Sequence, residues 1–315
     1  MEDAVIHHWE ATLGTKVYRV GTFRGHHLLE TESGEWVVKR SRHPSHLRWW
    51  IWVDRELRHR GFDRMPAYVT DGREWVLTSR VESRPATYRN PEEIRKVAGL
   101  LSHFHRAGRG LLTPLASSGS QTLMERVEVR YRSFSQLMKS VNGVDGELGD
   151  LLREYGAVYR RYGKIARERL KNLPVRELIR WERGGRCVAH RDLASHNILI
   201  DGRGKSWLID FETAEYDAQI GDLWQLLSRG LSEQDWDPAV LRETVATYEE
   251  NRPLVPVERM ILSVLLGFPN EFFREALGLT LKKTGYTEEK TLPYLKKIAH
   301  ALPRWQDFLR DWAGW

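Results

Sequence analysis

The sequence predicts an α+β protein, in which a small antiparallel β region containing one helix precedes a large and mainly helical region. Three observations predict this fold class. Residues 16–39 and 67–79 contain short runs of β-branched and aromatic residues separated by turns with Gly or Asp. Residues 45–60, and most of the chain after residue 90, repeat apolar residues at helical spacing. A short hairpin at residues 198–209 interrupts the helical part and carries the polar residues that suggest a function.

The first β region is predicted from five apolar runs. Turns at Ser33-Gly34 and Asp71-Gly72 separate neighbouring runs, and an antiparallel meander followed by a second hairpin is the simplest arrangement. Lys39 ends the third run, a position at which a lysine by itself is usually only solvated. The predicted strands are residues 16–20, 27–31, 36–39, 67–70 and 75–79.

The helix predicted at residues 45–60 carries a carboxylate on its apolar face. Asp54 lies three and four residues after Ile51 and Trp50, so it falls on the same stripe as these apolar side chains. A buried carboxylate needs a cationic partner, and Lys39 is the candidate that we expect to pair with Asp54.

Further helices are predicted at residues 90–106, 121–140, 147–183, after Asp222, and through 236–315. Asn90-Pro91-Glu92-Glu93 begins the first of them with an N-cap residue, a proline and acidic residues, and Pro174 marks a break in the third. His103 and His105 are two residues apart on a helix and do not face each other, which argues against a metal pair. We expect Asp222 to cap its helix and to support the loop before the hairpin.

The length and composition are those of a globular protein. The 315 residues suffice for one large domain or two modest ones, and 41% hydrophobic with 29% charged residues is an ordinary balance. Residues 1–8 lack the regions of a secretory signal, and the longest apolar run, Met260–Phe268, is too short to span a bilayer. We therefore expect a cytoplasmic protein without a membrane partner. Cys187 is the single cysteine, which excludes an intrachain disulfide, and its apolar neighbours predict a buried thiol.

The net charge of +6 permits an acidic partner. Much of the excess lies between Arg153 and Arg186, where there are eleven Lys or Arg and four Glu. This stretch could attract nucleic acid, another anionic polymer or a membrane surface, or it could be the solvated face of helices with local Glu partners. We favour the second interpretation and expect no nucleic-acid partner, because no nucleic-acid-binding motif accompanies the basic residues.

The hairpin at residues 198–209 places two metal-binding side chains together. In an antiparallel pair closed by the turn at 201–204, Asn197 before the first strand and Asp210 after the second lie at the same open end. An amide oxygen and a carboxylate suit Mg²⁺ that takes its other ligands from water and nucleotide phosphates. Asp192, five residues before Asn197, can orient an attacking hydroxyl and accept its proton. Alternatively these residues only flank strands and cap a turn, but their joint occurrence favours an active site.

His190-Arg191-Asp192, Asn197 and Asp210-Phe211 together resemble the catalytic and metal-binding segments of the protein-kinase-like superfamily. The resemblance implies a two-lobed fold with ATP and Mg²⁺ as cofactors. It implies that Asp192 is the catalytic base, that Asn197 and Asp210 bind magnesium, and that Lys39, paired with Asp54, contacts the ATP phosphates.

Arg80–Pro85 resembles the hinge between the two lobes of such proteins, where adenine meets the backbone. The expected division is a nucleotide-binding lobe at residues 1–79, a hinge at 80–85, and a catalytic and substrate lobe at 86–315. Gly21–Gly25 departs from the glycine-loop pattern, because no Gly-x-Gly-x-x-Gly is present, so contacts of this loop with phosphate are not assigned.

The segment after the hairpin resembles that of small-molecule kinases. The distance from Asp210 to Asp222 is too short for the activation segment of a protein kinase, and Glu212 replaces the glycine of Asp-Phe-Gly. These features resemble phosphotransferases of the aminoglycoside, choline and homoserine kinase type. Residues 100–107 and 265–273 further resemble the CotS family of spore-coat-associated kinase-like proteins, which implies a role in spore-coat assembly and coat proteins as candidate partners.

The resulting leading hypothesis is an ATP- and Mg²⁺-dependent phosphotransferase that acts on a hydroxyl of a small molecule or a coat protein. It would be cytoplasmic or associated with the spore coat. A kinase-like scaffold that binds coat proteins with little or no catalysis is an alternative, favoured by the irregular glycine loop. An RNA- or polyanion-binding protein is a third hypothesis, which rests only on the basic helices.

Overall fold

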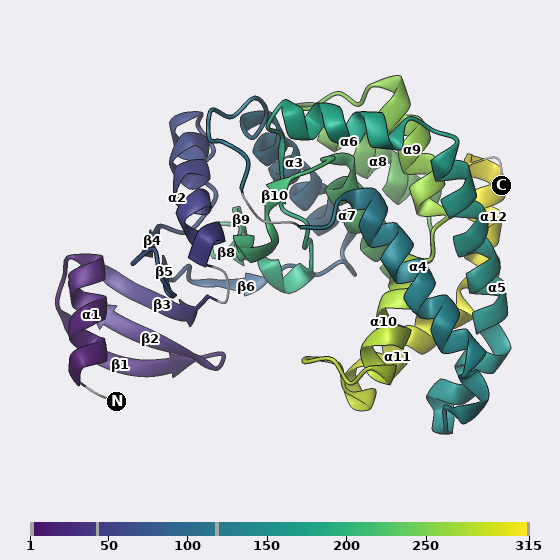
Figure 1. Ribbon diagram of the computed structural model, residues 1–315, viewed down its shortest axis with the longest axis horizontal. Helices are drawn as coiled ribbons and strands as arrows, with labels where there is room; N and C mark the ends of the chain where they lie inside the picture. The colour runs from purple at the N-terminus through teal and green to yellow at the C-terminus, as the bar shows by residue number, and fades with distance from the viewer. Residues whose placement is uncertain (1–2, 42–43, 117–119, 314–315) are drawn as a thin grey trace.

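The protein has a five-stranded antiparallel sheet at one end and a large body of helices at the other (Figure 1). The structure, a computed structural model, describes residues 3–41, 44–116 and 120–313. The chain begins beside the sheet and its last helix lies at the far end of the helical body (Figure 1). The helical stretch predicted at residues 236–315 is helical up to residue 313 at its C-terminal end, and its last two residues, 314–315, lie outside the described residues.

The predicted strands all form, and they join into one sheet in the order β1–β2–β3–β5–β4. Consecutive strands pair as the predicted meander and hairpin, and β3 pairs with β5, so that Lys39 lies opposite Val76. This pairing brings the two predicted β segments together. The strands are β1 (Val17–Phe23), β2 (His26–Thr31), β3 (Gly34–Arg40), β4 (Tyr68–Thr70) and β5 (Trp75–Ser79).

One face of the sheet is covered by helix α1 (Asp3–Leu13), which the sequence pattern did not predict. Its Trp9 is fully buried and belongs to a small apolar cluster with Leu29, Trp36, Val38 and Leu77. Val5, Ile6 and Leu13 of the same helix are partly buried against this cluster, so the apolar residues of α1 do recur at helical spacing, a short pattern that the sequence-based prediction did not use.

Helix α2 (Pro44–His59) forms at the predicted position and connects the sheet to the helical body. Its buried face belongs to the large apolar core that the C-terminal helices share. Trp50 stacks on Phe211, with ring centroids 4.3 Å apart and an interplanar angle of 14°. The helix before the predicted hinge is therefore packed against the segment that follows the catalytic hairpin.

The helical body begins with α3, where the side chain of Asn90 accepts a hydrogen bond of 3.0 Å from the Glu92 amide, as the N-cap prediction requires. Pro174 separates α5 from α6, which confirms the predicted break. On α5, Arg167 and Lys171 lie 3.3 and 3.4 Å from Glu128 of α4, whose side chain is 14% exposed, so these two basic residues pair with a largely buried carboxylate of the neighbouring helix. The helices are α3 (Pro91–Ala107), α4 (Leu123–Lys139), α5 (Gly146–Lys171), α6 (Val175–Gly184), α7 (Ile220–Glu233), α8 (Pro238–Glu249), α9 (Pro256–Leu266), α10 (Asn270–Thr280), α11 (Glu288–His300) and α12 (Leu302–Ala313).

Two small sheets lie in the helical body, and one of them contains the hairpin at residues 198–209. β6 (Ser83–Pro85) pairs with β8 (Ile198–Asp201), which pairs with β9 (Ser206–Leu208). β7 (Val188–Ala189) pairs with β10 (Glu215–Tyr216). The predicted hinge segment is thus hydrogen-bonded directly to the hairpin. None of the helices within the described residues is long and apolar enough to cross a membrane.

Candidate active site

The hairpin brings Asn197 and Asp210 to the same end, as its sequence predicted. Ile198 pairs with Leu208, and the Ile209 amide donates to the Asn197 carbonyl at 3.0 Å, so the two site residues flank this closing pair. Both side chains line one cavity. The antiparallel register alone therefore places an amide and a carboxylate side by side.

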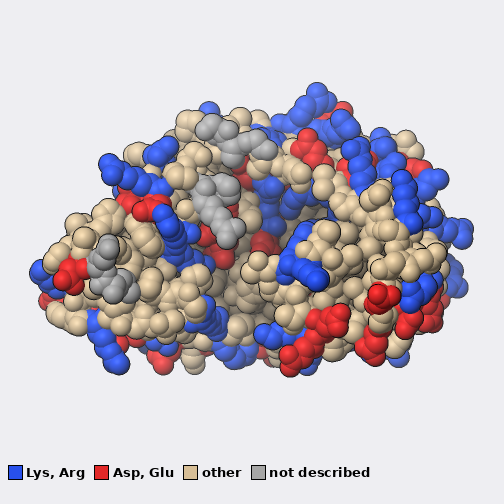
Figure 2. All heavy atoms as spheres, turned by 60° about the horizontal axis from the view of Figure 1, so that its bottom comes forward, with Lys and Arg blue, Asp and Glu red and all other residues tan. Residues whose placement is uncertain are grey.

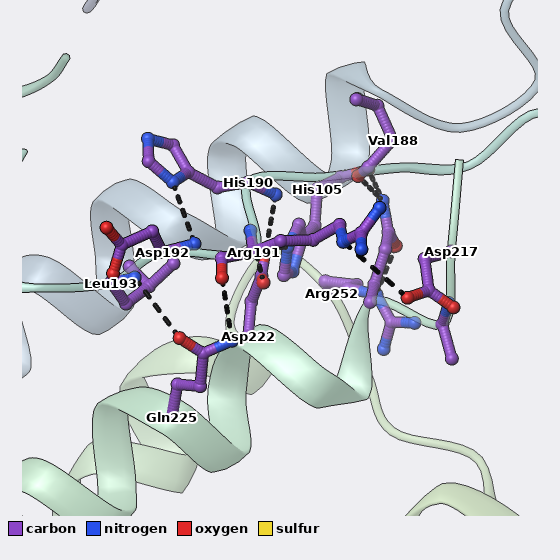
Figure 3. A network of polar contacts seen from close by, with 12 residues as sticks. His105, Val188, His190, Arg191, Asp192, Leu193, Asp217, Asp222, Gln225 and Arg252 are labelled. Atoms are coloured by element: carbon purple, nitrogen blue, oxygen red, sulfur yellow. Dashed lines mark hydrogen bonds and ion pairs between the residues drawn. The ribbon is translucent and has the colours of Figure 1, made fainter. Parts of the chain in front are cut away.

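The loop before the hairpin is held by buried side chains of α7 (Figure 3). Asp222 accepts hydrogen bonds from the amides of His190 (2.6 Å) and Arg191 (2.8 Å). Gln225 donates to the Arg191 carbonyl and accepts from the Leu193 amide. The predicted support by Asp222 is confirmed. The predicted cap is wrong, because α7 begins at Ile220 and Asp222 is already its third residue.

His190 fixes the loop to the hairpin from the other side. Its Nδ1 accepts a hydrogen bond from the Asp192 amide at 3.3 Å, which leaves Nε2 to donate to the Ile209 carbonyl at 2.9 Å. The backbone around Asp192 is therefore held both by α7 and by the strand that leads to Asp210. Such support keeps a catalytic side chain in one geometry.

Asp192 projects from this loop with 40% of its side chain exposed. Its Oδ2 accepts from Asn197 Nδ2 at 3.0 Å, and Arg229 Nη2 lies 3.4 Å from its Oδ1. Burial alone would raise the pKa of Asp192, but neighbouring groups, above all the charge of Arg229, outweigh it and hold the pKa below its ordinary value. Asp192 is thus ionised at neutral pH, the form that can accept a proton.

Asn197 presents its amide in one orientation. The Nδ2 group donates to both the carbonyl and the carboxylate of Asp192, which leaves the amide oxygen for a cation. Asp210 has a left-handed backbone (φ 65°, ψ 69°), a conformation that Asp and Asn adopt more readily than most residues. Within the described residues, no group of three or more His, Cys, Asp or Glu could hold a metal ion. Asn197 and Asp210 would therefore supply two ligands and leave the rest to phosphate and water, which fits Mg²⁺.

The predicted pair between Lys39 and Asp54 is wrong. Lys39 Nζ lies 3.3 Å from Asp210 Oδ2 instead. Asp54 is held by Arg58, one turn later on α2, through two hydrogen bonds of 2.9 and 3.0 Å. Arg58 reaches the carboxylate without any tertiary contact, so the local pair forms in preference to the distant lysine. Asp54 lies in the same cavity as Lys39, and its proposed part in cofactor binding stays a prediction.

The cavity that contains Lys39, Asn197 and Asp210 has a volume of about 320 Å³ and lies between the sheet and the hairpin. Apolar side chains from β3, β5, α2 and the hairpin contribute to its walls, together with polar side chains from the same elements and from the hinge segment. This combination, a mainly apolar slot with a few polar groups, is typical of small-molecule sites. The apolar lining residues include Val37, Val76, Leu47, Trp50, Met65, Leu199, Ile209 and Phe211. Arg80, Val81 and Ser83 of the predicted hinge also line it.

A tight turn replaces a glycine loop over this cavity. Arg24 and Gly25 connect β1 to β2, and both have positive φ, 51° and 81°. Phe23, Arg24 and His26 line the cavity from this turn. On the side of the β1–β2 turn, the cavity is therefore lined by one aromatic side chain, one arginine and one histidine.

Residues that the sequence pattern missed complete the site. Arg229 contacts Asp192 from 37 residues further along the chain, and His105 contacts Asp222 across 117 residues. The position of an arginine or a histidine on an apolar helix face does not indicate which distant residue it will contact. Helix packing brings these side chains to the catalytic loop.

His105 makes the fold sensitive to acid. It is fully buried between Tyr248 (2.7 Å) and Asp222 (3.1 Å), and burial lowers its pKa to about 4, although the bond to Asp222 acts in the opposite direction. In the unfolded chain this histidine binds a proton below about pH 6.5, whereas the folded protein keeps it neutral down to about pH 4. Stability therefore falls as pH falls through this window, by on the order of 2–3 kcal/mol.

We expect the melting temperature of the wild-type chain to fall more steeply between pH 7 and 4.5 than that of a His105→Gln variant. Asp222 and Asp192 have lowered pKa values and lose their stabilising contribution only at lower pH, so the two effects separate. The exposed His59, changed to Gln, is the matched control and should retain the wild-type slope. Equal slopes for wild type and His105→Gln would contradict the assignment.

Comparison with known proteins identifies related sequences. The model of the phosphotransferase enzyme family matches residues 23–257. Spore coat protein S of Bacillus subtilis is 24% identical over 284 residues, which cover 83% of this chain and 79% of that protein. The 3-deoxy-D-manno-octulosonic acid kinase of Vibrio cholerae is 32% identical over 126 residues, 40% of this chain and less than half (45%) of that kinase. The resemblance to the CotS family is thereby confirmed.

Solved structures share the fold at low sequence identity. An aminoglycoside phosphotransferase from Alicyclobacillus acidocaldarius has a TM-score of 0.78 at 20% identity, covering 94% of this chain and 91% of its own. Spectinomycin phosphotransferase in complex with ADP and spectinomycin has a TM-score of 0.66 at 12% identity, covering 96% and 99%. Choline kinase LicA from Streptococcus pneumoniae has a TM-score of 0.57 at 14% identity, covering 97% and 99%. These similarities confirm the predicted two-lobed, kinase-like α+β fold.

Proposed function

Because the chain belongs to the phosphotransferase enzyme family, we propose that it transfers the γ-phosphate of ATP to a hydroxyl group of an acceptor, with Mg²⁺ as the metal. Lys39 would contact the nucleotide phosphates, and Asn197 and Asp210 would hold the metal. Asp192 would orient the acceptor hydroxyl and take its proton. The observation that carries this proposal is that Lys39, Asn197 and Asp210 line one cavity while Asn197 binds Asp192 directly.

The donor set supports a hard cation at this place. A carboxylate and an amide oxygen suit Mg²⁺, whose charge would neutralise phosphate oxygens when it is bound. Lys39 adds a fixed positive charge 3.3 Å from Asp210. The protein therefore has the charges needed to position a phosphoryl group, and positioning is most of what phosphoryl transfer requires of a protein.

The cavity supports a nucleotide as the phosphate donor. Its apolar walls can cover a flat ring, and backbone at residues 80–85 can meet the ring edge. The solved spectinomycin phosphotransferase, of the same fold, is in complex with ADP. We place the nucleotide-binding lobe at 1–79, the hinge at 80–85 and the catalytic lobe at 86–315, and assign Asp54 to the wall of the nucleotide site.

The likeness to spore coat protein S supports a further proposal, that the protein acts in or near a spore coat after synthesis in the cytoplasm. Its acceptor would then be a small molecule or a coat-protein hydroxyl. The scaffold alternative is supported by the Arg24–Gly25 turn, which departs from a glycine loop. The complete set of Asp192, Asn197 and Asp210 favours catalysis, since a pure scaffold does not need all three.

A calorimetric titration with ATP, in the presence of Mg²⁺ and then of EDTA, tests the nucleotide site. We expect saturable binding of one MgATP per chain and weaker binding of ATP alone, because Asp210 and the phosphates repel each other without the metal. A folded wild-type chain that binds no MgATP would overturn the phosphotransferase proposal and favour the scaffold. Slow ADP release in the absence of acceptor would add direct evidence for phosphate transfer to water.

A further inference from the structure

Arg229 of α7 is a buried cation beside the proposed catalytic base. Only 8% of its side chain is exposed. Its Nη2 lies 3.4 Å from Asp192 Oδ1, and its Nε lies 3.8 Å from Glu271 Oε1. Within the part of the chain that the structure describes, neither Nε nor Nη1 has a hydrogen-bond partner. A buried N–H group without an acceptor costs about 1–3 kcal/mol, and more when charged, so this guanidinium has hydrogen-bonding capacity that no described protein group uses.

A second arginine of the same neighbourhood lacks an acidic partner. Arg130 of α4 donates to the neutral Asn270 side-chain oxygen, and the structure shows no ion pair for it among the described residues. Burial, together with the charges of Arg274, Arg126 and Arg229, lowers the pKa of Arg130 to about 10, although Glu271 acts in the opposite direction. The arginines of α4, α7 and α10 are therefore close enough to repel one another.

The two glutamates near these arginines, Glu271 and Glu275, already have partners within the protein. Glu271 accepts from Arg274 at 2.6 Å and from the neighbouring Asn270 amide at 2.7 Å. Glu275 lies 2.5 Å from Arg274, and burial raises its pKa, with Arg274 opposing, so its negative charge is held less firmly. Arg229 lies within ion-pair distance of Asp192 and Glu271, and Arg274 within ion-pair distance of Glu271 and Glu275. The three arginines (130, 229 and 274) therefore face three carboxylates, and among the described residues Arg130 is the one of the three with no carboxylate at ion-pair distance.

The neighbouring elements add cations. Arg126, one turn before Arg130, lies 3.2 Å from Asp217, and Arg191 lies 3.9 Å from the same carboxylate. The connection between α10 and α11 carries exposed Lys282 and Lys283 and projects towards the β1–β2 hairpin (Figure 1). Figure 2 shows a hollow on this side of the molecule, with basic side chains along its walls and acidic ones inside it. An acceptor would thus approach Asp192 past several positive charges.

On the basis of the proposed function, we propose that the acceptor carries an anionic group, a carboxylate or a phosphate, which Arg229 and Arg130 bind while Asp192 holds the hydroxyl. Arg229 contacts Asp192 through one nitrogen and has another nitrogen free of protein partners, so a single side chain can bridge the base and the anion. The anionic group therefore lies only a few bonds from the reacting hydroxyl. Cationic acceptors such as amino sugars or choline would be repelled here.

Matched three-carbon probes separate these charge classes. Glycerate, glycerol 3-phosphate, glycerol and 2-amino-1,3-propanediol would be titrated into the protein loaded with MgADP, and their phosphorylation by MgATP would be followed by ADP release. We expect one of the two anions to bind roughly tenfold to a hundredfold more tightly than glycerol, and the amine more weakly than glycerol. Preference for glycerate would identify a carboxylate site, and preference for glycerol 3-phosphate a phosphate site.

Variants connect this preference to the arginines. Arg130→Met should lower the affinity for the preferred anion at least roughly tenfold while glycerol binding and MgATP binding stay unchanged. Arg229→Met should lower the affinity for the anion at least as much, but it also removes the contact with Asp192, so its binding of glycerol is measured beside that of the anion. Arg130→Met is the safer variant, because its partner is neutral and no carboxylate loses its counter-charge. Arg132→Met, on the same helix but with 76% of its side chain exposed, is the matched control and should keep the preference.

Equal or stronger binding of glycerol or the amine would overturn the inference, and so would anion preference that survives in both arginine variants. Absence of detectable anion binding at millimolar concentration would also overturn it. If the wild-type chain binds MgATP in these cases, only the acceptor inference has failed. If it binds no MgATP, the proposed phosphotransferase function has failed instead.

Discussion

We expect an Asp192→Asn variant to lose phosphate transfer by roughly 10²–10⁴-fold while it binds MgATP as well as the wild-type chain does. The amide cannot accept the hydroxyl proton, but it has nearly the same shape as the carboxylate. Asp192 does not line the nucleotide cavity, which contains Lys39, Asn197 and Asp210, so its charge contributes little to nucleotide affinity. Rates of ADP release with acceptor, measured beside calorimetric MgATP affinity, separate the two effects.

The amide also changes one contact, which the experiment has to allow for. Asn197 and Arg229 both donate to Asp192, whereas an amide offers one acceptor atom, so one donor loses its partner at a cost of about 1–3 kcal/mol. A melting curve shows whether the variant is folded at the assay temperature. Asp150→Asn, on an exposed part of α5 with 76% of the side chain accessible, is the control for loss of a carboxylate. Wild-type transfer rates in Asp192→Asn would exclude Asp192 as the base.

An Asp210→Asn variant should lose the Mg²⁺-dependent part of nucleotide binding. Removal of a charged metal ligand should weaken MgATP binding at least roughly tenfold, and the difference between titrations with Mg²⁺ and with EDTA should largely disappear. Asparagine is the suitable replacement, because the backbone of Asp210 is left-handed (φ 65°) and asparagine adopts this conformation readily, whereas alanine does not. The comparison therefore tests the charge without straining the turn.

The loss of the ion pair with Lys39 is a minor effect in this variant. Both side chains are partly exposed, 24% and 32%, so the pair contributes at most about 1 kcal/mol to stability. Asp307→Asn, an exposed change on α12, is the matched control. If Asp210→Asn binds MgATP as the wild type does, with the same dependence on Mg²⁺, then Asp210 is not a metal ligand. The proposal that Asn197 binds the metal together with Asp210 would then fail as well.

The sequence alone determined the features that depend on neighbouring residues. The apolar runs that form β1 to β5, the N-cap at Asn90 and the break at Pro174 all follow from local backbone and capping preferences. The pairing of Asn197 with Asp210 followed in the same way, because a short turn fixes the register of a hairpin. Arg58 was also within local reach of Asp54, one helical turn away, and the expected Lys39 pair was wrong because this local partner was not considered.

Only the tertiary structure decided which distant side chains meet. Helical periodicity identifies the buried face of α7 but not the side chains against which it packs, so the contacts of His105 with Asp222 and of Arg229 with Asp192 could not be predicted. The same holds for Lys39 and Asp210, which are 171 residues apart. These partners are selected by the packing of whole helices and sheets. The hydrophobic effect determines which face of an element is buried, but it is not directional and does not determine which individual side chains come into contact.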